Sequence, residues 1–134
     1  MPNPTGGRIP YRYEIDSDRQ LVIATFFGAA SLADAEGIVA QLRADPRHSP
    51  MLPRLYDCRA VTRMPPVSEL RAVAELFRRS VDPTVPVRRA IVVKTGAYFG
   101  LGRMLQALLD LAGVDLNVFS DFDDAVEWVT NATA

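Results

Sequence analysis

The residue types best suited to chemistry lie in the segment TGAYFGLG, residues 95–102, between an apolar run and an apolar helical pattern. Glycines at this spacing can present backbone N–H groups to a pyrophosphate at the start of a helix. Glycine also lacks a Cβ, so the same residues would let a helix backbone approach a sheet closely. We favour the second interpretation, in which Gly96, Gly100 and Gly102 bring backbones together.

The segment resembles the cofactor loop of short-chain dehydrogenases, which has the pattern T-G-x-x-x-G-x-G. The resemblance implies that Asp121, nineteen residues beyond Gly102, binds the adenosine ribose of NAD(P). The rest of that family's pattern is missing, because only 32 residues follow Gly102 and the sole lysine, Lys94, precedes the loop, so no Tyr-x-x-x-Lys pair exists. NAD(P) binding is therefore a remote alternative, and we expect no cofactor.

Cysteine and histidine chemistry is limited because the chain has one residue of each type, Cys58 and His48. A disulfide or a Cys/His zinc site cannot be assembled within one chain, and a serine or cysteine nucleophile lacks a partner base. Prolines around His48 predict a solvated loop residue, and Cys58 at a strand end reads as a small buried residue. We expect no catalytic residue and no metal.

Composition and charge further narrow the classes of protein to which the chain can belong. A chain of 134 residues with 49% hydrophobic residues suits one domain, here residues 11–130 after a flexible start at 1–10. The net charge of -1 gives no general pull toward nucleic acid. Residues 54–103 carry ten basic against four acidic residues and residues 104–134 carry six acids and no base, so we expect the two parts to meet and partly neutralise each other. No membrane span or targeting segment is apparent, which favours a soluble cytoplasmic protein.

Five segments have strand patterns. Residues 11–16 alternate apolar and charged side chains, as an edge strand does, and residues 21–28 form an apolar run typical of a central strand. These two predict a hairpin. Three further short strands are expected at residues 54–58, 88–93 and 115–120.

Four helices alternate with these strands after the hairpin. They are expected at residues 32–44, 68–81 and 99–112 and in a terminal segment after residue 120, with Ser31, Ser68 and Ser120 as N-caps. The order predicts an α/β fold with a single five-stranded mixed, mostly parallel sheet, an N-terminal hairpin and four helices.

Ligands in such sheets favour the crevice beyond the carboxyl ends of the strands. In this chain the expected ends lie near residues 28, 57–63, 94–102 and 120. The candidate ligand-binding residues there are Asp57, Arg59, Arg63, Lys94, Tyr98 and Arg103.

The helix at 99–112 has a polar strip of Arg103, Gln106 and Asp110 and is apolar in nearly all other directions. Neighbouring helices can cover so wide an apolar surface, or it can form a homodimer interface or a pocket wall. The candidate interface residues are Leu101, Met104, Leu105 and Leu108.

The whole of residues 11–130 resembles the small bacterial SpoIIAA-like proteins, which share features with STAS and lipid-carrier SEC14 domains. The resemblance rests on LVIATFFGAASLADAE, LYDCRAV, RRAIVVKTGAYFGLGRM and VDLNVFSDFDDAVEWV in this order. It implies a non-enzymatic, often self-associating domain. The phosphorylated antagonists carry D-S-S-G where this chain has Asp57, Cys58, Arg59 and Ala60, so a phosphorylation switch is not expected.

These observations favour a non-catalytic domain that acts by protein association, with a homodimer as the expected partner state. The alternative is a carrier or sensor that holds a lipid-like or small apolar anionic ligand between helices and sheet. In that case Arg59, Arg63 or Arg103 would meet its acidic head.

Overall fold

A computed structural model describes residues 11–82, 84–85 and 87–131, so the flexible start predicted for residues 1–10 lies outside the described residues. The strands are β1 (Tyr11–Asp16), β2 (Leu21–Ala29), β3 (Arg54–Arg63), β4 (Arg89–Val92) and β5 (Leu116–Phe119). The helices are α1 (Leu32–Ala44), α2 (Val67–Ser80), α3 (Ala97–Leu111) and α4 (Phe122–Thr130).

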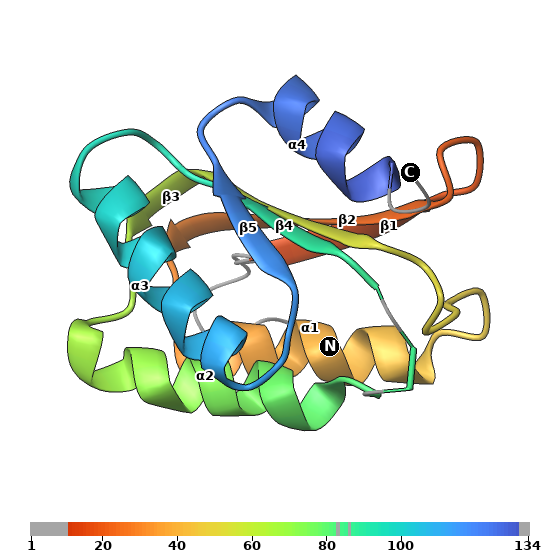
Figure 1. The fold of residues 1–134 in the computed structure, drawn as a ribbon, viewed down its shortest axis with the longest axis horizontal. Helices are drawn as coiled ribbons and strands as arrows, with labels where there is room; N and C mark the ends of the chain where they lie inside the picture. The colour runs from red at the N-terminus through yellow and green to blue at the C-terminus, as the bar shows by residue number, and fades with distance from the viewer. Residues whose placement is uncertain (1–10, 83, 86, 132–134) are drawn as a thin grey trace, which may run out of the picture.

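The five strands form one sheet in the order β1-β2-β3-β4-β5, which is also their order along the chain. β1 is antiparallel to β2, and the other neighbouring pairs are parallel. Helices α1, α2 and α3 cover one face, and α4 alone lies across the other, over β3, β4 and β5 (Figure 1). The predicted fold class is confirmed.

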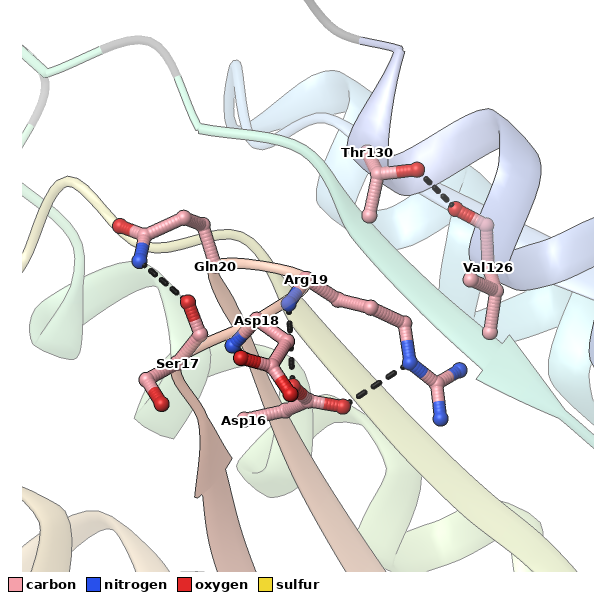
Figure 2. Close-up of polar contacts among 7 residues, drawn as sticks. All are labelled: Asp16, Ser17, Asp18, Arg19, Gln20, Val126 and Thr130. Atoms are coloured by element: carbon pink, nitrogen blue, oxygen red, sulfur yellow. Dashed lines mark hydrogen bonds and ion pairs between the residues drawn. The ribbon is translucent and has the colours of Figure 1, made fainter.

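The β1–β2 turn is closed by one carboxylate. Asp16 accepts hydrogen bonds from the backbone N–H groups of Asp18 and Arg19, both at 3.0 Å, and from Arg19 Nε at 2.9 Å (Figure 2). Gln20 follows with a φ of 54°, in the left-handed region, and its side chain donates to the carbonyl of Ser17. These local bonds fix the register that pairs Asp16 with Leu21.

Two apolar cores lie on the two faces of the sheet. The larger core joins the sheet to α1, α2 and α3. The smaller core lies under α4 and contains Leu21, Ile23, Leu55, Ala90, Val92, Ala125 and Val129. Because β2 contributes residues to both cores, its sequence is a nearly continuous apolar run.

Of the three predicted N-caps, one is confirmed and two are wrong. Ser31 Oγ accepts from the N–H of Asp34, as expected. Helix α2 starts at Val67 with Pro66 as N-cap, because the fixed φ of proline suits this position, and Ser68 lies inside the first turn. Helix α4 is capped by Asp121, whose carboxylate accepts from Asp124, so Ser120 lies one residue too early.

Two elements, one strand and one helix, extend beyond their predicted boundaries. β3 continues to Arg63, five residues beyond the predicted end, because it pairs with the second half of β2 through an irregular register. α3 starts at Ala97, two residues before the predicted start, so residues 97–102 of the glycine segment are helical. The extension of β3 lengthens the carboxyl edge of the sheet, where the candidate residues lie.

Candidate functional site

Asp57 and Arg59 form the best-defined polar pair at the carboxyl edge. The Arg59 Nε and Nη2 groups donate to the two carboxylate oxygens of Asp57 at 2.9 and 2.8 Å, and the Arg59 N–H donates at 3.1 Å. The guanidinium also lies 4.8 Å from the centre of the Phe122 ring on α4. Arg59 is therefore held from two sides by groups of its own chain.

The charges around this pair are nearly balanced. Burial alone would raise the pKa of Asp57, but the hydrogen bonds and charge of Arg59 outweigh it and hold that pKa below its ordinary value. Asp121 and Asp123 add to the negative field at Arg59. The basic middle of the chain thus meets its acidic end here, and Arg59 retains little unbalanced charge for an acidic ligand.

Lys94 and Tyr98 form a second contact at the start of α3. Tyr98 donates from its hydroxyl to the carbonyl of Thr62 at 2.8 Å, and Lys94 Nζ lies 5.4 Å from the centre of the Tyr98 ring. This arrangement ties α3 to the end of β3. Arg63 lies exposed at that strand end, where its carbonyl accepts from the N–H of Ala30, and Arg103 is exposed on α3. Among the six candidate residues, the structure therefore brings together two pairs, Asp57 with Arg59 and Lys94 with Tyr98.

The N-cap Gly96 and the two glycines within α3, Gly100 and Gly102, differ in their surroundings. A Cβ on Gly102 would lie 3.0 Å from Val118 Cγ1 on β5, so the expected close approach is confirmed there. A Cβ on Gly100 would meet nothing within 4 Å, so the same expectation is wrong at that position. Gly96 is required by its φ of +81° and not by close contact. The Asp121 carboxylate, the predicted ribose ligand, is used to cap α4.

The outer face of α3 carries exposed apolar side chains. Met104 is 44% exposed and Leu111 is 88% exposed, whereas Leu101 and Leu108 are half-buried. Leu105 is 5% exposed and belongs to the larger core, so it is not available to a partner surface. Sequence reasoning missed Leu111 because the apolar pattern of α3 runs nearly all the way round the helix.

Cys58 and His48 occupy different environments from each other. Cys58 is buried as predicted, and burial raises the pKa of its thiol to about 12. His48 lies in a loop, as its prolines suggested, but it is partly buried, and Arg54 Nη2 lies 2.9 Å from its Nε2. Burial and the Arg54 charge lower the pKa of His48. The sequence feature that could have indicated a polar site near His48 is the arginine at the first position of both β3 and β4.

Two features are absent from the described residues. Within residues 11–131, apart from 83 and 86, no helix is long and apolar enough to cross a membrane. The same part of the chain holds no group of three or more His, Cys, Asp or Glu side chains placed to bind a metal ion.

Comparison with known proteins defines the fold. No family model matches the chain, and no curated protein is significantly similar to it. The arrangement of the sheet and helices is a SpoIIAA-like α/β fold. It is shared by the solved structure of an uncharacterized protein from the DUF3478 family with a SpoIIAA-like fold, from Shewanella loihica PV-4, which is 13% identical, with a TM-score of 0.60. The alignment covers 89% of this chain and 93% of that chain, so the predicted resemblance is confirmed at the level of the fold.

Proposed function

We propose that this SpoIIAA-like domain is non-catalytic and acts by protein association, pairing with a second copy of itself through the outer face of α3. The observation that supports the proposal most directly is the exposure of Leu111 at the end of α3, 88% of whose surface faces solvent. Single exposed apolar residues are ordinary, but Leu111 belongs to an ordered row.

That row runs along α3 and is defined by Gly100, Met104, Ala107 and Leu111, which are all exposed. The spacing of four, three and four residues is the spacing at which two helices pack along a shared seam. Two small residues alternate with two large ones, so the large side chains of one copy can lie over the small residues of the other. The row therefore has the pattern of a helix–helix contact.

Charges beside the row fit an antiparallel pair. Arg103 and Asp110 are exposed along one side of it, seven residues apart and near opposite ends. When two copies of α3 pack antiparallel about a two-fold axis, Arg103 of each copy comes opposite Asp110 of the other. No ion pair among the described residues uses either side chain within the chain. The surface is thus self-complementary in charge as well as in shape.

The size of the α3 surface determines how tightly two copies are expected to bind each other. A helix of fifteen residues is about 22 Å long, and a stable interface buries about 800 Å² on each partner. One helix face supplies only part of that area. We therefore expect a dimer with a dissociation constant in the micromolar range.

Sedimentation velocity over a wide range of protein concentration tests the proposal. The wild-type chain should move from monomer to dimer, and Leu111→Glu should remain monomeric because a charge would be buried in the seam. The matched control is Met51→Glu, at another exposed apolar residue in the loop between α1 and β3, which should dimerise like wild type. Arg103→Glu should weaken the dimer, and adding Asp110→Arg should restore it. A wild-type chain that stays monomeric throughout would refute the proposal.

A carrier function is the second candidate, supported by an apolar cavity of about 60 Å³ between the sheet and the helices. Its walls include Cys58, Phe77 and Leu105, whereas none of the three arginines expected to meet an acidic head lines it. Ligand pockets commonly measure about 300 Å³ or more, so this cavity would have to open to hold a lipid-like molecule. Native mass spectrometry of the purified protein distinguishes the candidates, because a carrier retains a small molecule and a pairing module gives only monomer and dimer masses.

A further inference from the structure

A second and larger cavity lies at the opposite edge of the sheet from the candidate residues. It measures about 260 Å³ and opens between α1, the end of α2 and the first residues of β3 and β4. One wall is apolar and comes from α1. The polar lining consists of Arg43, His48, Arg54, Tyr56, Ser80 and Arg89.

Two of its arginines are placed side by side by the sheet itself. Arg54 and Arg89 are register partners at the first positions of the parallel strands β3 and β4. Like charges at directly opposed positions repel each other. Arg89 is only 4% exposed, and its Nη1 donates to the carbonyl of Val87. The fold thus brings two guanidinium groups together in a place where little water screens them.

The contact between Arg54 and His48 fixes the tautomer of the imidazole. A guanidinium has only donors, so His48 Nε2, 2.9 Å from Arg54 Nη2, must be the acceptor. The ring proton is therefore on Nδ1 of a neutral imidazole. His48 Nδ1 is buried and has no hydrogen-bond partner among the described residues.

Arg54 Nη1 is also buried and has no hydrogen-bond partner in the part of the chain that the structure describes. Both unpaired atoms are therefore donors, and leaving a buried donor unpaired costs about 1–3 kcal/mol. No aspartate or glutamate is among the described residues that line the cavity, although Asp45 and Asp115 lie near it. The Asp45 carboxylate is occupied by Arg47 and Tyr13. The described residues that line the cavity therefore offer these donors no carboxylate acceptor.

We propose that this cavity is a binding site for a small oxyanion, in which a phosphate or carboxylate group accepts hydrogen bonds from Arg54 and His48 beside Arg89. The apolar wall from α1 would contact a short hydrocarbon part of the same molecule. Water takes up about 30 Å³ per molecule, so the volume suits a small metabolite and excludes a peptide or a lipid tail. The site lies away from the outer face of α3 and does not depend on pairing.

The electrostatics of the cavity agree with this assignment. Burial, together with the charge of Arg54, lowers the pKa of Arg89. The same two causes lower the pKa of His48. A bound anion would oppose both effects, because it favours the charged form of each group.

NMR of the imidazole provides a direct test, because His48 is the only histidine of the chain and gives one set of ring signals in protein without a histidine tag. Inorganic phosphate and isobutyrate are titrated separately at about pH 8, where the ring is neutral, with sodium chloride holding the ionic strength constant. We expect a saturable shift of the His48 signals within the millimolar range for at least one probe. Saturation by phosphate alone or by isobutyrate alone would identify the group that the site prefers.

Variants separate the site from non-specific charge effects. Arg54→Gln should weaken binding by at least about tenfold, since it removes a charged donor. Arg71→Gln removes an arginine that is exposed on α2 and should leave binding unchanged. If Arg54→Gln does not fold, thermal protection of His48→Gln by the same probe serves instead and should be reduced. Shifts that grow linearly without saturation, or equal binding by folded Arg54→Gln and wild type, would overturn the proposal.

Discussion

Gly102 on α3 lies directly against Val118 on β5, because a Cβ added to Gly102 would lie only 3.0 Å from Val118 Cγ1. A residue other than glycine at position 102 would require the neighbouring atoms to move. Val118 is 6% exposed and β-branched, so it has little room to turn away. We expect Gly102→Ala to lower the free energy of unfolding by about 1 kcal/mol, because overpacking outweighs the gain in helix propensity. Urea denaturation followed by circular dichroism measures this.

Gly100→Ala is the matched control in the same helix. A Cβ there meets nothing within 4 Å, so the substitution should raise the free energy of unfolding by about 0.5–1 kcal/mol. Gly100 lies on the proposed pairing row, so both variants are compared at low protein concentration. Equal effects of the two substitutions would show that α3 does not lie against β5 as described.

Removal of Arg59 should destabilise the protein, because the buried Asp57 carboxylate would lose its ion-pair partner. Asp57 is 8% exposed, whereas the Arg59 side chain is about half exposed. We expect Arg59→Met to lower the free energy of unfolding at neutral pH by about 1–2 kcal/mol, a modest value because solvent screens the pair. Urea denaturation at two pH values checks it.

The pH dependence distinguishes this cause from lost packing. Asp57 has a lowered pKa in the wild-type fold, so its contribution is present above the unfolded value of about 4 and is lost as the pH falls. Without Arg59, burial would raise that pKa, so the destabilisation should shrink when the carboxyl is protonated in acid. Arg63→Met, at an exposed site on the same strand, should have little effect at either pH. A loss for Arg59→Met that is the same at both pH values would point to packing alone.

Cys58 should be inert in the folded protein. Its thiol is buried and its pKa is raised to about 12, so almost no thiolate exists at neutral pH. We expect reaction with a thiol reagent such as Ellman's reagent to follow the rate of unfolding and to become fast in urea. Rapid stoichiometric labelling in native buffer would contradict the burial of this side chain.

Asp45 should contribute to acid sensitivity. Its carboxylate accepts from the Tyr13 hydroxyl at 2.7 Å and from Arg47 Nη2 at 2.8 Å, and the bonds from Arg47 and then Tyr13 hold its pKa well below the ordinary value. A lowered folded pKa gives stability that is present above about pH 4 and is lost as the pH falls further. Asp45→Asn should therefore flatten the acid limb of a plot of unfolding free energy against pH. An unchanged limb would assign the acid sensitivity to other carboxylates.

Much of the fold could be predicted from local patterns. Alternation at residues 11–16, the apolar run at residues 21–28 and the hydroxyl of Ser31 each reflect a local physical preference, and all three predictions are confirmed. The extension of β3 could not be predicted in this way. Residues 59–63 are mostly polar or small, and they are in a strand because β2 pairs with them.

The polar sites were harder to predict, because their geometry depends on register between distant segments. Arg54 and Arg89 are 35 positions apart in the sequence and become neighbours only through the β3–β4 pairing. The prolines around His48 correctly indicated a loop, but not that the loop folds back onto Arg54. At the carboxyl edge, the expected crevice residues are mostly paired with one another or with the backbone.

The spatial order of the strands in the sheet is the same as their order of synthesis. Each strand after β1 can therefore pair with the strand synthesised just before it. Such a chain can fold progressively during translation, with little need to hold early segments open for later ones. The same strand order makes incomplete chains that end before β5 prone to aggregation. A nascent chain that stalls before β5 would leave the backbone edge of β4 unpaired beside apolar side chains, and truncated products ending there should aggregate or be captured by chaperones.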